Sequence, residues 1–90
     1  MTDITTTLTQ RGQRYGDFTG QSKITQDIKR AMRQGNWPDL SDPQRECLEM
    51  LAVKISRILN GDPDYHDNWH DIIGYTTLVA ETINRNPNQK

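Results

Sequence analysis

Two helical segments joined by only four residues constrain the fold of this chain more than any other feature. Apolar residues recur at helical spacing over 42–60 and again over 65–85. The connection 61–64 reads Gly-Asp-Pro-Asp, which is too short for anything but a tight reversal. The two segments are therefore expected to form an antiparallel helical hairpin.

The first half of the chain has helical periodicity as well. A weak helix is expected over 3–14 and a second one over 21–34, with Gly35 as its stop. No stretch of the sequence alternates with period two. The prediction is an all-α protein, a small bundle of about four helices in one domain over 1–90, with a tail that frays at about 85–90.

Local signals support the boundaries and faces of the two longer helices. Ser41 and Gln44 are spaced as a capping box, and Pro43 stands in the first turn. One face of 42–60 is apolar, and Cys47 is expected to fill the core beside it. The residues expected on the buried arc of 65–85 are Trp69, Ile72, Ile73, Thr76, Val79, Ala80 and Ile83.

A low apolar content predicts that the chain associates with itself. Only 32% of its residues are apolar, and a monomer of 90 residues buries only about two-thirds of its unfolded surface. A second copy of the chain would supply the missing buried area, most simply in a dimer with twofold symmetry. Tyr75 and Leu78 lie on the arc opposite the apolar one, and they mark the expected interface.

Composition also excludes several classes of protein. A single cysteine rules out a disulfide framework and a zinc site with several cysteines, and it is compatible with a reducing cytoplasm. No apolar run exceeds four residues, so no membrane span is expected, and the first residues lack the basic and apolar regions of a secretory signal. The formal charge is −1, which makes nucleic acid an unlikely partner, although residues 1–36 carry +3 and residues 37–90 carry −4.

Two constellations have side chains suited to chemistry. Lys54 and Arg57, one turn apart, are able to grip a phosphate, while the alternative is that Lys54 covers apolar surface with its stem and Arg57 is a surface charge. Asp67, Asp71 and Tyr75 share one arc of 65–85. That arc is either solvated or meets a ligand, a metal or another subunit.

Three stretches together resemble a family of small phage and prophage proteins without an assigned activity. They are 14–18 (Arg-Tyr-Gly-Asp-Phe), 54–63 (Lys-Ile-Ser-Arg-Ile-Leu-Asn-Gly-Asp-Pro) and 67–75 (Asp-Asn-Trp-His-Asp-Ile-Ile-Gly-Tyr). The resemblance covers roughly 14–80. It implies a cytoplasmic protein of the bacterial host and names a family rather than a reaction.

More remotely, Lys-x-x-Arg at 54–57 followed by Asp-x-x-x-Asp-x-x-x-Tyr at 67–75 resembles the MazG-like, all-α nucleotide pyrophosphohydrolase superfamily. The resemblance implies a helical, oligomeric protein that binds nucleotides between helices. The enzymes of that superfamily hold Mg²⁺ with a Glu-Glu-x-x-Glu helix and a later Glu-x-x-Asp helix.

The chain departs from both metal motifs of that superfamily. Glu46 and Glu49 stand for part of the first motif, but Arg45 occupies the place of its leading glutamate. Asp67 and Asp71 are one residue too far apart for the second motif. Hydrolysis through two Mg²⁺ ions needs several converging carboxylates, so these departures argue against hydrolysis and leave nucleotide binding open.

The function expected from these features is non-enzymatic binding of a phosphorylated nucleotide, without a cofactor, in the phage setting as a sponge that sequesters a signal of host immunity. The expected ligand-binding residues are Arg14, Tyr15, Lys54, Arg57, Asp67, Asp71 and Tyr75. One alternative is a Mg²⁺-dependent nucleoside triphosphate pyrophosphohydrolase that uses Glu46, Glu49, Asp67 and Asp71. The other is a protein-binding inhibitor of a host factor, with Leu78 on its interface.

Overall fold

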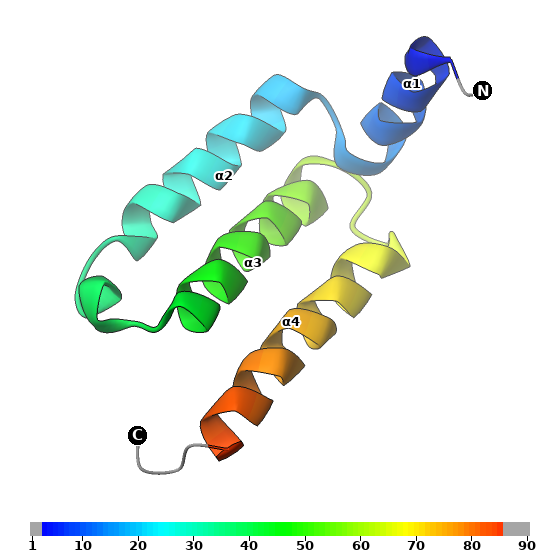
Figure 1. Ribbon diagram of the computed structural model, residues 1–90. Helices are drawn as coiled ribbons and strands as arrows, with labels where there is room; N and C mark the ends of the chain where they lie inside the picture. Colours follow the sequence, from blue (N-terminus) through cyan, green and yellow to red (C-terminus); the bar gives the residue numbers. More distant parts are fainter. Residues whose placement is uncertain (1–2, 86–90) are drawn as a thin grey trace.

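The computed structural model describes residues 3–85, and all regular structure in that range is helical (Figure 1). The elements are α1 (Ile4–Tyr15), α2 (Phe18–Met32), a short 3-10 turn η1 (Trp37–Asp39), α3 (Asp42–Asn60) and α4 (His66–Arg85). The prediction of an all-α chain with four helices and no strand is confirmed for the described residues. The tail expected to fray at about 85–90 lies, beyond Arg85, outside them.

Helix α3 lies between α2 and α4 and packs against both, while α1 lies beyond the end at which α3 finishes (Figure 1). Helix α4 leads back alongside α3 after the short connection between them (Figure 1). Lys54 of α3 contacts Asp71 of α4, and earlier in α3 Leu51 lines a groove with Thr76 of α4. This arrangement brings the end of α3, the beginning of α4 and the turn between α1 and α2 to one end of the molecule.

Capping side chains mark where α2 and α3 begin. Ser41 Oγ accepts from the backbone N–H of Gln44 at 3.3 Å, and the Ser41 N–H donates to Gln44 Oε1 at 2.9 Å, so the predicted capping box is confirmed. Asp17 Oδ2 accepts from the Gly20 N–H at 2.9 Å. This second cap starts α2 at Phe18, three residues before the predicted start.

The end of α2 also differs from the prediction. The helix stops at Met32, two residues short of the expected boundary, and Arg33 caps it. Gly35 adopts a φ of 60° in the turn that follows, so it serves the turn rather than the helix end. The positive φ is a conformation that glycine adopts without steric cost.

The interior of the described chain is unusually polar. Cys47 and Ala52 are its only buried apolar residues, whereas Thr25 and Ser56 are both buried and joined by a hydrogen bond of 2.6 Å between their hydroxyl oxygens. Burial raises the pKa of the Cys47 thiol, as expected for a core position. None of the described helices is long and apolar enough to cross a membrane.

The prediction of a buried arc on α4 is wrong for the residues at the centre of that arc. Trp69 is 50% exposed and Ile73 is 63% exposed, and Thr76, Ala80 and Ile83 are exposed as well. Helix α4 instead turns the edge of that arc toward α3, with Asn68 fully buried there. This rotation allows Asp71, which the amphipathic pattern placed on the far side, to reach Lys54.

The rotation leaves a continuous apolar surface uncovered. Leu48 and Leu51 of α3 line one groove with Thr76 of α4, so the neighbouring turns of both helices face the same side. We call this surface the apolar face. Its large exposed members are Leu48, Ile55 and Leu59 on α3 and Trp69, Ile73 and Ile83 on α4.

Candidate functional site

The turn between α1 and α2 is fastened to the end of α3 by three hydrogen bonds. Asn60 Nδ2 donates to the backbone oxygens of Tyr15, at 2.8 Å, and Asp17, at 2.9 Å. The N–H of Asp62 donates to the backbone oxygen of Arg14 at 2.8 Å. Residues about 45 positions apart in sequence are thereby held side by side.

Two glycines make this close approach possible. A Cβ on Gly16 would lie 2.1 Å from the backbone oxygen of Asn60, and one on Gly61 would lie 2.2 Å from the backbone oxygen of Arg14. Gly16 also has a φ of +76°, in the left-handed region that favours glycine. The glycines in the two sequence stretches 14–18 and 54–63 therefore serve a single backbone contact.

Arginines and tyrosines gather where the turn meets α3 and α4. The guanidinium carbon of Arg57 lies 4.3 Å from the ring centre of Tyr15, and that of Arg11 lies 5.2 Å from the same centre. Arg14 lies 5.0 Å from the ring centre of Tyr65, and the two tyrosine rings meet edge to face at 6.1 Å. We call these five residues the junction cluster.

The three arginines of the junction cluster have no carboxylate partner within residues 3–85. Elsewhere in that range Lys23, Lys29, Arg30, Arg45, Lys54 and Arg85 form ion pairs. Three positive charges that face aromatic rings rather than carboxylates repel one another unless an anion lies between them. The cluster is therefore a candidate anion-binding site.

Two buried donors, one in the cluster and one beside it, also favour an oxygen ligand at this place. Arg57 Nε and Asn68 Nδ2 are both shielded from solvent and lack a hydrogen-bond partner among the described residues. Arg57 lies one turn after Lys54 on α3, and Asn68 lies about one turn before Asp71 on α4, so both sit next to the Lys54–Asp71 contact on its junction side. Buried donors without acceptors are costly, and an incoming oxygen ligand near them would lower that cost.

Lys54 and Asp71 form a pair at the contact of α3 and α4. Lys54 Nζ lies 2.8 Å from Asp71 Oδ2, and Lys54 is only 8% exposed. The hydrogen bond from Lys54 holds the pKa of Asp71 below its usual value, and the charges of Lys54, His70 and Arg57 act in the same direction. Lys54 therefore binds a carboxylate of its own chain, and Arg57 is the cation left with free donors.

The other predicted residues occupy two places. Asp67 accepts from the Tyr65 hydroxyl at 2.9 Å, and this hydrogen bond raises the pKa of Tyr65. Tyr75 lies farther along α4, where it lines a shallow hollow of about 210 Å³ with Asp71 and Leu78. The structure thus brings Arg14, Tyr15, Arg57 and Asp67 to the junction, places Lys54 and Asp71 next to it, and leaves Tyr75 apart.

The sequence reasoning missed Tyr65, Arg11 and Asn68. Tyr65 follows a short polar connection directly before α4, and an aromatic residue there is a signal that could have been used. Asn68 lies one turn before Ile72 and two turns before Tyr75, which places it at the edge between the predicted apolar arc and the opposite arc. This edge position is the signal that could have been used for Asn68.

The carboxylates of the enzymatic alternative do not gather into one group. Among residues 3–85 no three Asp, Glu, His or Cys side chains lie close enough together to hold a metal ion. Glu49 lies 3.8 Å from Lys29, and Glu46 lines a hollow beside Cys47 and Tyr75. Asp67 and Asp71 have the partners described above.

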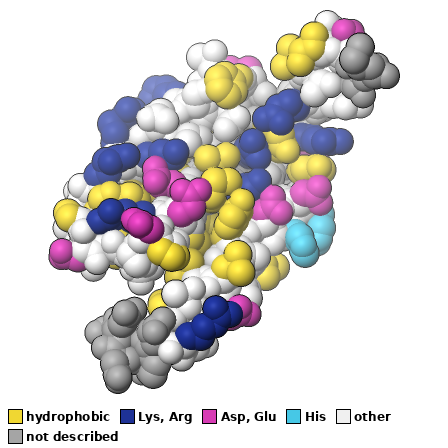
Figure 2. Space-filling view, viewed as in Figure 1, with side chains coloured by type: hydrophobic (Ala, Val, Ile, Leu, Met, Phe, Trp, Pro, Cys, Tyr) yellow, Lys and Arg dark blue, Asp and Glu magenta, His cyan; other side chains and the backbone are white. Residues whose placement is uncertain are grey.

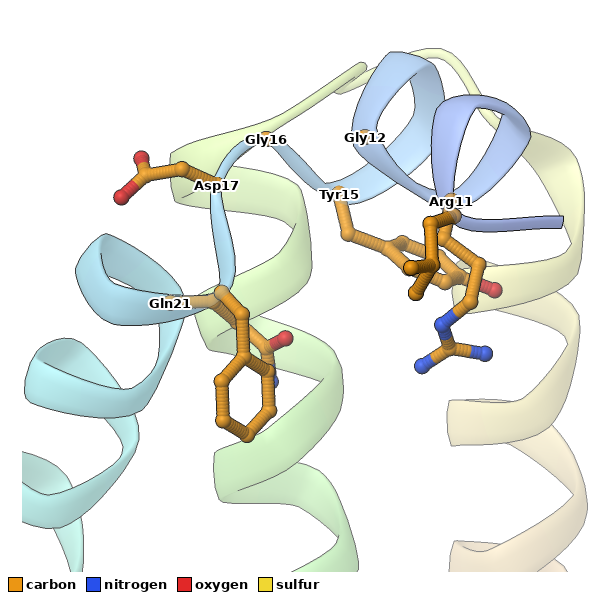
Figure 3. A pocket seen from close by; sticks show the side chains of 8 residues that line it. Arg11, Gly12, Tyr15, Gly16, Asp17 and Gln21 are labelled. Carbon is orange, nitrogen blue, oxygen red and sulfur yellow. The ribbon is translucent and has the colours of Figure 1, made fainter. Parts of the chain in front are cut away.

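A pocket of about 300 Å³ adjoins the junction cluster between α1 and α2 (Figure 3). Arg11 and Tyr15 belong to both the pocket and the cluster. On the face drawn in Figure 2, Lys and Arg side chains gather over α1 and α2, and both histidines lie over the beginning of α4.

Comparisons of the chain with protein-family models, with curated proteins and with solved structures gave no match. The residues of the junction and their geometry are therefore the observations from which a function is proposed.

Proposed function

We propose that the chain binds a phosphorylated nucleotide at the junction cluster and holds it without cleaving it. The observation that carries the proposal is the Arg57 guanidinium, which faces the Tyr15 ring and has a buried Nε without a partner among the described residues. Arg11 and Arg14 add two more cations without carboxylate partners there. A guanidinium offers a planar fork of donors that matches the oxygens of a phosphate.

Each neighbouring side chain has a supporting role in this proposal. The rings of Tyr15 and Tyr65 hold the guanidiniums in place through cation–π contacts, and Asp67 orients Tyr65 by accepting a hydrogen bond from its hydroxyl. The Lys54–Asp71 pair fixes α3 against α4 and so positions Arg57. Lys54 is then a positioning residue, and the phosphate contacts fall to Arg57 and Arg14.

The resemblance to small phage proteins and to MazG-like proteins supports the nucleotide class and a setting in the cytoplasm of a bacterial host. In that setting the protein would sequester a nucleotide signal of host immunity. Retention without hydrolysis is supported by Arg45, which stands where the enzymes have a glutamate, and by the separation of Glu46 and Glu49 from the two aspartates of α4.

The proposal is tested by what the pure protein retains. The protein is incubated with a mixture of nucleotides, with and without Mg²⁺, washed, and heated, and the released molecules are identified by mass spectrometry. Intact nucleotide in both conditions is the expected result. Cleaved product that requires Mg²⁺ would instead support the pyrophosphohydrolase alternative, and no retained nucleotide would contradict both and favour the protein-binding alternative.

We propose in addition that the chain acts as a homo-oligomer, most simply a dimer, in which a second copy covers the apolar face. Among the described residues only Cys47 and Ala52 are buried apolar residues, whereas six large side chains of the apolar face are exposed. A second copy packed on this face would complete the apolar core that a single chain lacks.

The geometry of the apolar face favours a second copy over an unrelated partner. Ile55 follows Leu48 by seven residues on α3, and Ile73 and Ile83 continue the same side of α4. An antiparallel hairpin with an apolar seam on both helices is half of a four-helix bundle, and two copies complete it. A copy of the chain is also present at the same place and concentration whenever the chain is made.

A further inference from the structure

The side chain of Gln21 lines the pocket between α1 and α2. The residue as a whole is 7% exposed, its side chain makes no hydrogen bond within residues 3–85, and its amide atoms are not among those shielded from solvent. Its backbone oxygen accepts from Thr25 at 2.9 Å, so the backbone of the residue is satisfied while the amide is not. Figure 3 shows Gln21 on the α2 side of the pocket and Tyr15 and Arg11 on the α1 side.

The Gln21 amide offers a donor and an acceptor side by side. Neither atom has a partner among the described residues and neither is shielded from solvent, so both are free to bind a ligand that enters the pocket. A ligand that presents an acceptor next to a donor would satisfy both atoms at once. The hydrogen-bonding edge of a nucleobase is a group of this kind, whereas a phosphate is not.

Aromatic rings frame the same pocket. Phe18 is 77% exposed although it is the only phenylalanine of the chain, and Tyr15 lines the pocket beside Arg11. Bases stack on exposed aromatic rings and on guanidinium planes, and the stacking does not depend on which base is present. A volume of about 300 Å³ is at the lower end for small-molecule sites, which suits one planar ring system.

From these observations we infer that the pocket binds the base of the nucleotide, with the Gln21 amide paired to the hydrogen-bonding edge of the base and Phe18 stacked on its ring. The inference rests on the proposed function. Arg11 and Tyr15 line the pocket, and Arg57 lies over the Tyr15 ring, so base and phosphates of one molecule reach adjoining sites. The base pocket then decides which nucleotide is held, while the arginines supply binding to any phosphate chain.

The test compares ligands with and without a base. ATP, GTP, CTP, UTP and inorganic triphosphate are titrated calorimetrically into wild type and into Phe18→Ala, Gln21→Met and the control Gln26→Met, which alters an exposed glutamine of the same helix. The wild type should bind at least one nucleoside triphosphate about tenfold or more tightly than inorganic triphosphate. Phe18→Ala and Gln21→Met should each lose most of that advantage and bind inorganic triphosphate as the wild type does.

The outcomes separate this inference from the function on which it rests. Nucleotide binding that Phe18→Ala leaves unchanged, or inorganic triphosphate that binds as tightly as every nucleotide, overturns the base pocket while phosphate binding at the arginines stands. Failure of all four nucleotides and of inorganic triphosphate overturns both. Phe18 is exposed, so its variant stays informative even if Gln21→Met fails to fold.

Discussion

The junction and the apolar face differ in the interactions that their side chains make. At the junction, directional bonds dominate: Asn60 binds two backbone oxygens, and Gly16 and Gly61 let the backbones approach closely. On the apolar face, Leu59 is 67% exposed, and it belongs to a row of large side chains that no described residue covers. One region is fastened by bonds within the chain, and the other leaves large apolar side chains exposed.

This difference separates the tasks that the two regions can perform. A junction built from hydrogen bonds and glycines holds Arg57 and Tyr15 in a fixed geometry, which recognition of a phosphorylated ligand requires. An uncovered apolar surface lacks directional groups but gains free energy from any well-fitting apolar partner. We therefore propose ligand binding for the junction and self-association for the apolar face.

The largest effect is expected from a side chain placed inside the junction. Gly61→Ala puts a Cβ 2.2 Å from the backbone oxygen of Arg14, so the backbone at Gly61 and the backbone at Arg14 must move apart to admit it. The free energy of unfolding should fall by about 2–4 kcal/mol in urea titrations followed by circular dichroism. Unchanged stability would show that the turn between α1 and α2 is not fastened to α3 as described.

The next largest effect is expected on the apolar face. Ile55→Asp places a charge in the middle of the proposed interface, and light scattering should show the mass in solution fall from that of a dimer to about 10.4 kDa. Leu78→Asp is the matched variant, since Leu78 is also exposed but lies beside Asp71 and Tyr75 on the other side of α4. Dissociation by Leu78→Asp alone would move the interface to the face that the sequence pattern first indicated.

A smaller effect, dependent on pH, is expected where the two regions meet. Lys54 holds the pKa of Asp71 below its ordinary value of 3.8, so the ionised carboxylate stabilises the fold above pH 3.8, and this contribution is lost as the pH falls through the lowered pKa. Asp71→Asn should therefore be less stable than wild type at pH 7, and the difference should narrow below about pH 4. A difference that stays constant down to pH 2.5 would contradict the pairing.

The smallest effect has the opposite sign. Gly74 lies in the interior of α4, and a Cβ added there meets nothing within 4 Å. Gly74→Ala should raise the free energy of unfolding by about 0.5–1 kcal/mol, because alanine favours the helix. Destabilisation by Gly74→Ala would show that a partner approaches the backbone of α4 on this side, which is the side of Leu78.

Sequence periodicity was sufficient for the helices but not for their orientation. The pattern located four helices, and the capping box at Ser41 and the end of α3 at Gly61 followed from local chemistry. Periodicity identified the apolar arc of α4 without showing which edge of it meets α3. That choice depends on the Lys54–Asp71 pair and on the buried Asn68, which are tertiary contacts between helices.

The site was only partly predictable for a similar reason. Arg14, Tyr15 and Arg57 were recognised by residue type and by resemblance, and the structure places them together. Tyr65 and Gln21 were missed, because their proposed roles depend on a contact between the α1–α2 turn and the end of α3 that no spacing along the chain encodes. Asn60, which makes that contact, is an ordinary helix-end residue when read in sequence.

The most direct test of the account is a calorimetric titration of ATP and inorganic triphosphate into wild type, Arg57→Ala and Arg33→Ala, with folding checked by circular dichroism. Arg33 is a matched control, since it also lies over an aromatic ring, 5.9 Å from that of Trp37, and has no ion pair in the described range. Arg57→Ala should weaken binding by about ten- to a hundredfold, the effect of one charge-assisted contact, while Arg33→Ala binds as wild type. Equal binding by wild type and a folded Arg57→Ala would contradict the assignment of ligand binding to the junction.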